Sequence, residues 1–110
     1  MDTTKTIREA IKAQQEQNFD QAAKLYRMVL DDEPNNPDAN HNLAIIELFF
    51  GRHESALLGF ETALTARPDV EKFWLSYFGA LLKANELEKA QWLIEEAEKK
   101  SVSKEIISLF

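Results

Sequence analysis

The chain contains no cysteine, and glycine and proline are scarce, with three residues of each in 110. The absence of cysteine excludes disulfide scaffolds, thiolate zinc sites, iron–sulfur centres and cysteine nucleophiles. So few turn-forming residues argue against a loop-rich β protein. Basic residues are in the minority, with 13 Lys and Arg against 19 Asp and Glu and a formal net charge of −6. We therefore expect neither nucleic acid nor an anionic membrane as a partner.

Long apolar segments are also missing. The longest run, Leu43 to Phe50, is short and carries Glu47, so no segment is expected to span a bilayer. The first residues lack the apolar core of a signal peptide, and we expect a cytoplasmic location. The chain does have 45% apolar residues, too many for a disordered tail. These observations predict one small all-α domain over residues 1–110.

An internal period of 34 residues runs through the chain without a gap. A shift by this distance aligns Ala22 with Ala56 and Ala90. The further matches are Tyr26 with Phe60 and Ile94, Leu30 with Leu64, and Pro34 with Pro68. Apolar residues within each unit follow the three-and-four spacing of a buried helix face. The sequence therefore predicts three helical hairpins, at about 3–36, 37–70 and 71–104.

Capping residues and prolines indicate where these helices begin and end. Asn18 or Asp20 can accept hydrogen bonds from the free N–H groups that open the second helix. Pro34 prevents that helix from continuing. Asn36 and Pro37 are a typical cap and first residue for the third helix. The expected later helices are 53–66, 71–83 and 86–99, followed by a terminal capping helix at about 103–110. The chain ends on the apolar residues Leu109 and Phe110, so either these two residues dock firmly or the chain is a fragment of a longer protein, and we favour the fragment.

This pattern resembles the tetratricopeptide repeat. The second unit carries Leu43-Ala44, Gly51, Ala56, Phe60, Ala63, Leu64 and Pro68, and the third carries Trp74-x-x-Tyr77-Phe78-x-x-Leu81. The first unit matches through Ala22, Tyr26 and Pro34, although Thr6 and Glu9 stand at normally apolar positions. The resemblance covers residues 3 to 102. It implies an α-solenoid of three helix–turn–helix hairpins, stacked in a right-handed superhelix with a concave groove.

The resemblance also implies a function, a protein–protein interaction module that binds a peptide or helix of a partner protein in this groove. It implies no enzyme activity, catalytic residue, cofactor or metal. The expected groove residues are Arg8, Ile11, His41, Asn42, Ile45, Phe49, Lys72, Leu75, Ser76 and Lys83. Their apolar members would form a strip that marks an interaction surface. The cations Arg8, Lys72 and Lys83 favour an acidic or carboxylate-bearing partner.

Two subgroups of the family bind peptides through defined polar sets. Asn42 and Lys72 stand at two of the five places that grip a C-terminal carboxylate in one subgroup. The other three places hold Ile7, Ile11 and Ser76, and an isoleucine cannot hold a carboxylate. In the other subgroup a ladder of asparagines binds the peptide backbone, and here Asn42 fills one rung with Arg8 and Ser76 at the flanking rungs. Ser and Arg can still bond to peptide carbonyls, so a weaker version of this ladder stays open.

Two alternative functions stay open at this stage. The groove or the helix ends could meet a second copy, which would make the chain a homo-oligomerising or scaffold segment. The chain could also be a targeting domain of a larger transferase enzyme, since its third unit is similar to repeat segments of bacterial multidomain proteins. Catalysis by the chain itself is not expected. Asp38 and His41 share a helix face but lack a third metal ligand, and the sequence has no phosphate loop or nucleophile turn.

Overall fold

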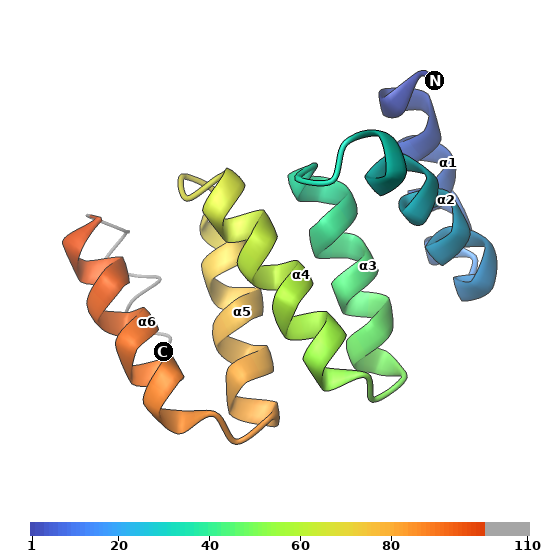
Figure 1. The fold of residues 1–110 in the computed structure, drawn as a ribbon. Helices are drawn as coiled ribbons and strands as arrows, with labels where there is room; N and C mark the ends of the chain where they lie inside the picture. Colours follow the sequence, from blue (N-terminus) through green and yellow to red (C-terminus); the bar gives the residue numbers. More distant parts are fainter. Residues whose placement is uncertain (101–110) are drawn as a thin grey trace.

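The computed structural model describes residues 1–100, which form six α-helices without a strand. They pair as α1 (Thr3–Gln15) with α2 (Phe19–Asp32), α3 (Pro37–Phe49) with α4 (His53–Ala66), and α5 (Glu71–Lys83) with α6 (Leu87–Lys99). The hairpins stand side by side in a row, and their three turns lie along one edge of the molecule (Figure 1). The expected all-α helical repeat solenoid is thereby confirmed. The expected terminal helix at 103–110 lies outside the described residues.

Local signals fix the helix ends. The Asn18 side chain accepts a hydrogen bond from the backbone N–H of Gln21, and the Asn36 side chain accepts one from Ala39 at 2.9 Å. The last helix begins at Leu87, one residue later than expected, because Glu86 takes the N-cap position. Each hairpin turn contains one residue in the left-handed region at the same place in the 34-residue period. These residues are Gln17 (φ 62°), Gly51 (φ 78°) and Asn85 (φ 59°).

The apolar core consists of two clusters that meet at α3. The first cluster joins α1 and α2 to Ala39, Leu43 and Ile46 of α3. The second begins at Ala44 and extends through α4 and α5 to α6. The hairpins share their cores, because α2 is covered by α3 and α4 is covered by α5, each the first helix of the next hairpin. This is the arrangement of a solenoid, in which neighbours stabilise one another.

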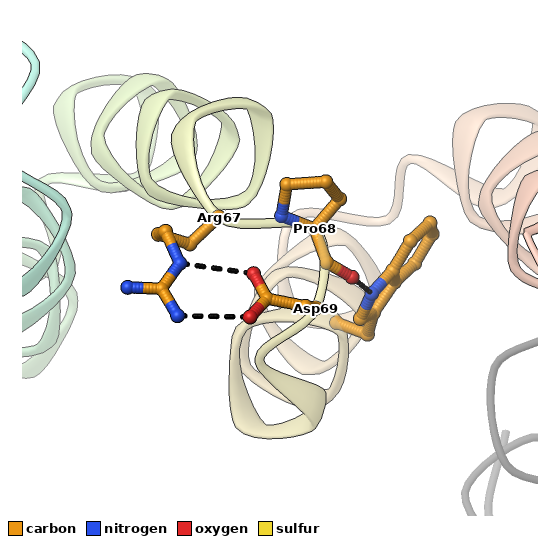
Figure 2. A network of polar contacts seen from close by, with 4 residues as sticks. Arg67, Pro68 and Asp69 are labelled. Atoms are coloured by element: carbon orange, nitrogen blue, oxygen red, sulfur yellow. Dashed lines mark hydrogen bonds and ion pairs between the residues drawn. The ribbon is translucent and has the colours of Figure 1, made fainter.

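A proline carbonyl is used in the same way at both joints between hairpins. Asn40 donates its Nδ2–H to the carbonyl oxygen of Pro34 at 3.0 Å. One period later, Trp74 donates its indole Nε1–H to the carbonyl oxygen of Pro68 at 2.8 Å, as Figure 2 shows. Beside Pro68, Arg67 and Asp69 form two parallel hydrogen bonds of 2.9 and 2.8 Å between side chains. An amide and an indole thus perform the same task, and both fix the entry of the next hairpin's first helix.

The closest approach of α3 and α4 lies at Gly59. A Cβ atom at this position would stand 3.0 Å from the Cβ of Ala44 and 3.0 Å from the carbonyl oxygen of Asn40. The second contact is to backbone, which cannot move without disturbing α3. Gly59 is therefore required by the packing of the central hairpin.

We predict that Gly59→Ala lowers the free energy of unfolding by about 1–3 kcal/mol, the usual cost of overpacking. Gly79→Ala is the matched control, because a Cβ there meets no described atom within 4 Å. Since Gly79 lies inside α5, this change should be neutral or stabilise the fold by up to about 1 kcal/mol. Urea unfolding followed by circular dichroism measures both. Equal effects of the two substitutions would contradict the close contact.

Candidate partner-binding face

The exposed and half-buried side chains of α1, α3 and α5 form one surface, which we call the first-helix face. It contains nearly all the residues that the sequence assigns to the groove. Arg8, Lys72 and Lys83 are exposed, whereas Ile11, Asn42, Leu75 and Ser76 are half-buried. Ile45 is 39% exposed and Phe49 is 71% exposed. A role for these residues in binding a partner stays a prediction.

His41 differs from the expectation that it lines an open groove. Its side chain is only 4% exposed, and its ring lies between Phe73 and Phe60, at centroid distances of 4.8 and 5.5 Å. Its Nε2 is 2.7 Å from Ser76 Oγ, and its Nδ1 is 3.2 Å from Asn42 Oδ1. A neutral ring satisfies both contacts when Nδ1–H donates to Asn42 and the Ser76 hydroxyl donates to Nε2. His41 therefore joins α3 to α5, and a partner cannot reach it.

Asn42 has a second polar neighbour in Tyr26. The buried Tyr26 hydroxyl donates to Gln14 Oε1 at 2.6 Å, and the Asn42 side chain lies close enough to lower the pKa of Tyr26, against the larger effect of burial. Burial raises the pKa of Tyr26 to about 12, so the phenol keeps its proton. The resulting polar network runs from α1 through α2 and α3 to α5. It fixes the Asn42 amide at the centre of the first-helix face, where a rigid amide can bind a peptide backbone at little entropic cost.

The charges of the molecule are unevenly distributed. Helices α1, α3 and α5 carry five basic and four acidic residues, a net charge of +1, whereas α2, α4 and α6 carry four basic and nine acidic residues, a net charge of −5. The ion pairs within residues 1–100 are Arg67–Asp69, Lys89–Glu61 and Lys99–Glu96. None of them neutralises Arg8, Lys72 or Lys83. The first-helix face thus presents three cations that have no ion pair within residues 1–100, although Lys72 lies over the Phe73 ring.

The rings of Phe19, Phe49 and Phe50 form a cluster that the sequence did not predict, which we call the aromatic shelf. The ring centroids lie 5.3 Å apart for Phe19 and Phe49, 6.0 Å for Phe19 and Phe50, and 5.3 Å for Phe49 and Phe50. The guanidinium of Arg52 lies 5.8 Å from the centroid of the Phe50 ring. Repeat alignment could have revealed the anomaly, since Glu16 and Ala84 occupy the places equivalent to Phe50.

Neither metal chemistry nor membrane insertion finds support in residues 1–100. This part of the chain holds no group of three or more His, Asp and Glu side chains that could bind a metal ion. It also holds no helix of the length and apolarity needed to cross a bilayer. The features that distinguish the first-helix face are therefore its apolar strip, its cations and the Asn42 network.

Stacked helical hairpins with these features define a protein of the helical repeat class. A family model described as tetratricopeptide repeat matches residues 13–58. The crystal structure of the Sgt2 TPR domain from Aspergillus fumigatus is 26% identical and superposes with a TM-score of 0.76, over 94% of this chain and 71% of that one. These comparisons show a tetratricopeptide repeat at residues 13–58 and the fold of a tetratricopeptide repeat domain over nearly all of the chain.

Other solved structures share the fold at lower identity. The first TPR of Spaghetti (RPAP3), bound to the HSP90 peptide SRMEEVD, has a TM-score of 0.79 and 17% identity over 96% of this chain and 84% of that one. MamA has a TM-score of 0.78 and 19% identity over 92% of this chain, which spans 54% of the MamA chain. No curated protein sequence matches the chain.

We predict a pH-dependent stability that originates at His41. Burial, aided by the charge of Lys72, lowers the pKa of His41 below its usual 6.5, against the opposing effects of Asn42 and Asp38. The His41 imidazole therefore takes up a proton more readily in the unfolded chain than in the folded one. Neutral His41 therefore makes its full contribution to the free energy of unfolding above about pH 6.5, and this contribution is lost as the pH falls below that value.

The measurement compares the wild type with His41→Gln in denaturant unfolding at neutral pH and near pH 5. Both proteins share the same carboxylates and His53, so only the wild type loses the His41 contribution. We expect a larger fall in the unfolding free energy for the wild type. Equal falls in the two proteins would show that His41 ionises as freely in the fold as in the unfolded chain.

Proposed function

We propose that this chain is a protein–protein interaction module that binds a peptide segment or helix of a partner protein along its first-helix face. The observation that carries the proposal is the exposure of Ile45 and Phe49, one helical turn apart on α3. Apolar side chains on the other sides of α3 are buried in the two core clusters. The exposure of Ile45 and Phe49 on the first-helix face is typical of an interaction surface.

The arrangement around the strip supports a peptide as the occupant. Asn42 is fixed at its centre by His41 and can bind a backbone amide. Arg8 lies on the preceding hairpin, and Leu75 and Ser76 lie on the following one, so a bound segment would contact all three hairpins. A related fold, the first TPR of Spaghetti, is solved with an acidic peptide bound, which supports the same use of the fold here.

We further propose that the partner segment is acidic. Arg8, Lys72 and Lys83 have no ion-pair partner among residues 1–100, while nine of the 13 acidic residues in the six helices lie on the second helices. Carboxylates that approach the first-helix face therefore meet unpaired cations. Ile7 and Ile11 occupy places where carboxylate-gripping relatives are polar, which favours acidic side chains within a segment over a terminal carboxylate.

We predict that Lys72→Glu weakens the binding of a short blocked peptide, in which glutamates flank a central tryptophan, by about tenfold, equivalent to about 1.4 kcal/mol. Lys24→Glu makes the same change of charge on the exposed surface of α2 and is the matched control. We expect it to change the affinity by less than about twofold, because its charge lies off the face and is screened by salt. Fluorescence anisotropy with a labelled peptide gives both affinities.

Salt dependence provides an independent check. If the cations of the first-helix face dominate, added salt weakens binding of the glutamate peptide. If the net charge of −6 dominates, added salt strengthens binding by screening the repulsion. The second result, or equal effects of the two lysine substitutions, would contradict the proposed acidic partner.

A further inference from the structure

The aromatic shelf lies at one end of the first-helix face, next to the turn between α3 and α4. Phe49 is 71% exposed and Phe50 is 50% exposed, although each ring contacts the other two. Phe19 belongs to the first hairpin and the other two rings to the second, so their mutual contact fixes the shelf across a joint of the solenoid. The shelf is a preformed apolar surface of three rings.

The fold itself does not require aromatic residues at these places. In the equivalent position to Phe49, the first hairpin has Gln15 and the third has Lys83. For Phe50 the equivalents are Glu16 and Ala84. All three hairpins form the same turn with a left-handed residue directly afterwards. The turn therefore forms without aromatic side chains at these positions. An exposed apolar surface that the fold does not require indicates a binding site.

Charge identifies the kind of occupant. Arg52 lies 5.8 Å from the centroid of the Phe50 ring and forms no ion pair within residues 1–100. Lys83, at the place equivalent to Phe49 in the third hairpin, is unpaired in the same part of the structure. A ring cluster beside Arg52, a cation without an ion pair in this part of the chain, matches an apolar side chain that has carboxylates beside it. A second copy of this chain is a poorer match, because each copy carries a net charge of −6.

We propose that the aromatic shelf binds an aromatic side chain, flanked by carboxylates, from the partner segment that lies along the first-helix face. The proposal rests on the function proposed above and names the anchor residue of that segment. The aromatic ring of the partner packs on Phe49 and Phe50, and the neighbouring carboxylates pair with Arg52 and Lys83. Asn42 and Lys72 bind the rest of the segment.

The test uses the glutamate peptide with a central tryptophan and the same peptide with alanine at the centre. Phe49→Gln removes the most exposed ring and introduces the residue that the first hairpin carries at this place, so the helix should tolerate it. Leu58→Gln is the matched control, since Leu58 is 68% exposed on α4, a second helix. Circular dichroism confirms that both variants fold.

We expect Phe49→Gln to weaken binding of the tryptophan peptide about tenfold and to leave the alanine peptide unchanged. Leu58→Gln should leave both unchanged. In amide NMR spectra, the tryptophan peptide should shift Phe49, Phe50 and Arg52 together with Asn42 and Leu75. This coupling between one ring of the protein and one ring of the peptide supports the proposal.

Other outcomes overturn it in distinguishable ways. Equal binding of the two peptides, with shifts at Asn42 and Leu75 but none at Phe49, would remove the shelf as an anchor site and leave the proposed function intact. An absence of shifts along the whole first-helix face with either peptide would remove both. Shifts of Phe49 and Phe50 that depend on protein concentration without peptide would show that a second copy covers the shelf.

Discussion

The contact between one hairpin's second helix and the next hairpin's first helix is the constraint on which the structure depends. Helix α3 shows this most clearly, because Leu43 and Ile46 belong to the core with α1 and α2, whereas Ala44 belongs to the core with α4 and α5. Each hairpin alone would leave an apolar face in water. Stability is consequently shared between neighbours, and a change in α3 acts on both clusters at once. The close approach at Gly59 and Ala44 fixes the central hairpin that connects them.

The repeats preserve backbone positions more strictly than residue types. A proline carbonyl at each joint accepts a hydrogen bond from the residue six places later, which is Asn40 at the first joint and Trp74 at the second. Gln17, Gly51 and Asn85 likewise share the left-handed conformation in the hairpin turns. The geometry of the turn therefore selects a conformation, and different side chains satisfy it. Positions free of such constraints, such as Phe49 and its equivalents, are those at which each hairpin can acquire a binding property of its own.

The sequence predicted the helices well because their ends depend on local interactions. Asn18, Asn36 and Pro37 act on backbone groups within a few residues, so their effects can be inferred from adjacent sequence. The burial of His41 could not be inferred in this way, since its ring is covered by Phe60 of α4 and Phe73 of α5. The aromatic shelf is also a contact between hairpins. The family resemblance assigned Phe49 to the expected groove, but it could not show that Phe19 and Phe50 would contact its ring.

An acidic protein can bind an acidic segment because screening separates its two kinds of surface. At physiological salt the Debye length is about 8 Å, whereas a helix with its side chains is about 10 Å across. The acidic side chains of α2, α4 and α6 therefore act weakly on a segment in contact with α1, α3 and α5. In the proposed complex, Arg8, Lys72 and Lys83 act at contact distance and largely determine how the segment approaches and orients. The proposed aromatic packing on the shelf depends little on salt, so in that complex it acts mainly on how slowly the segment leaves.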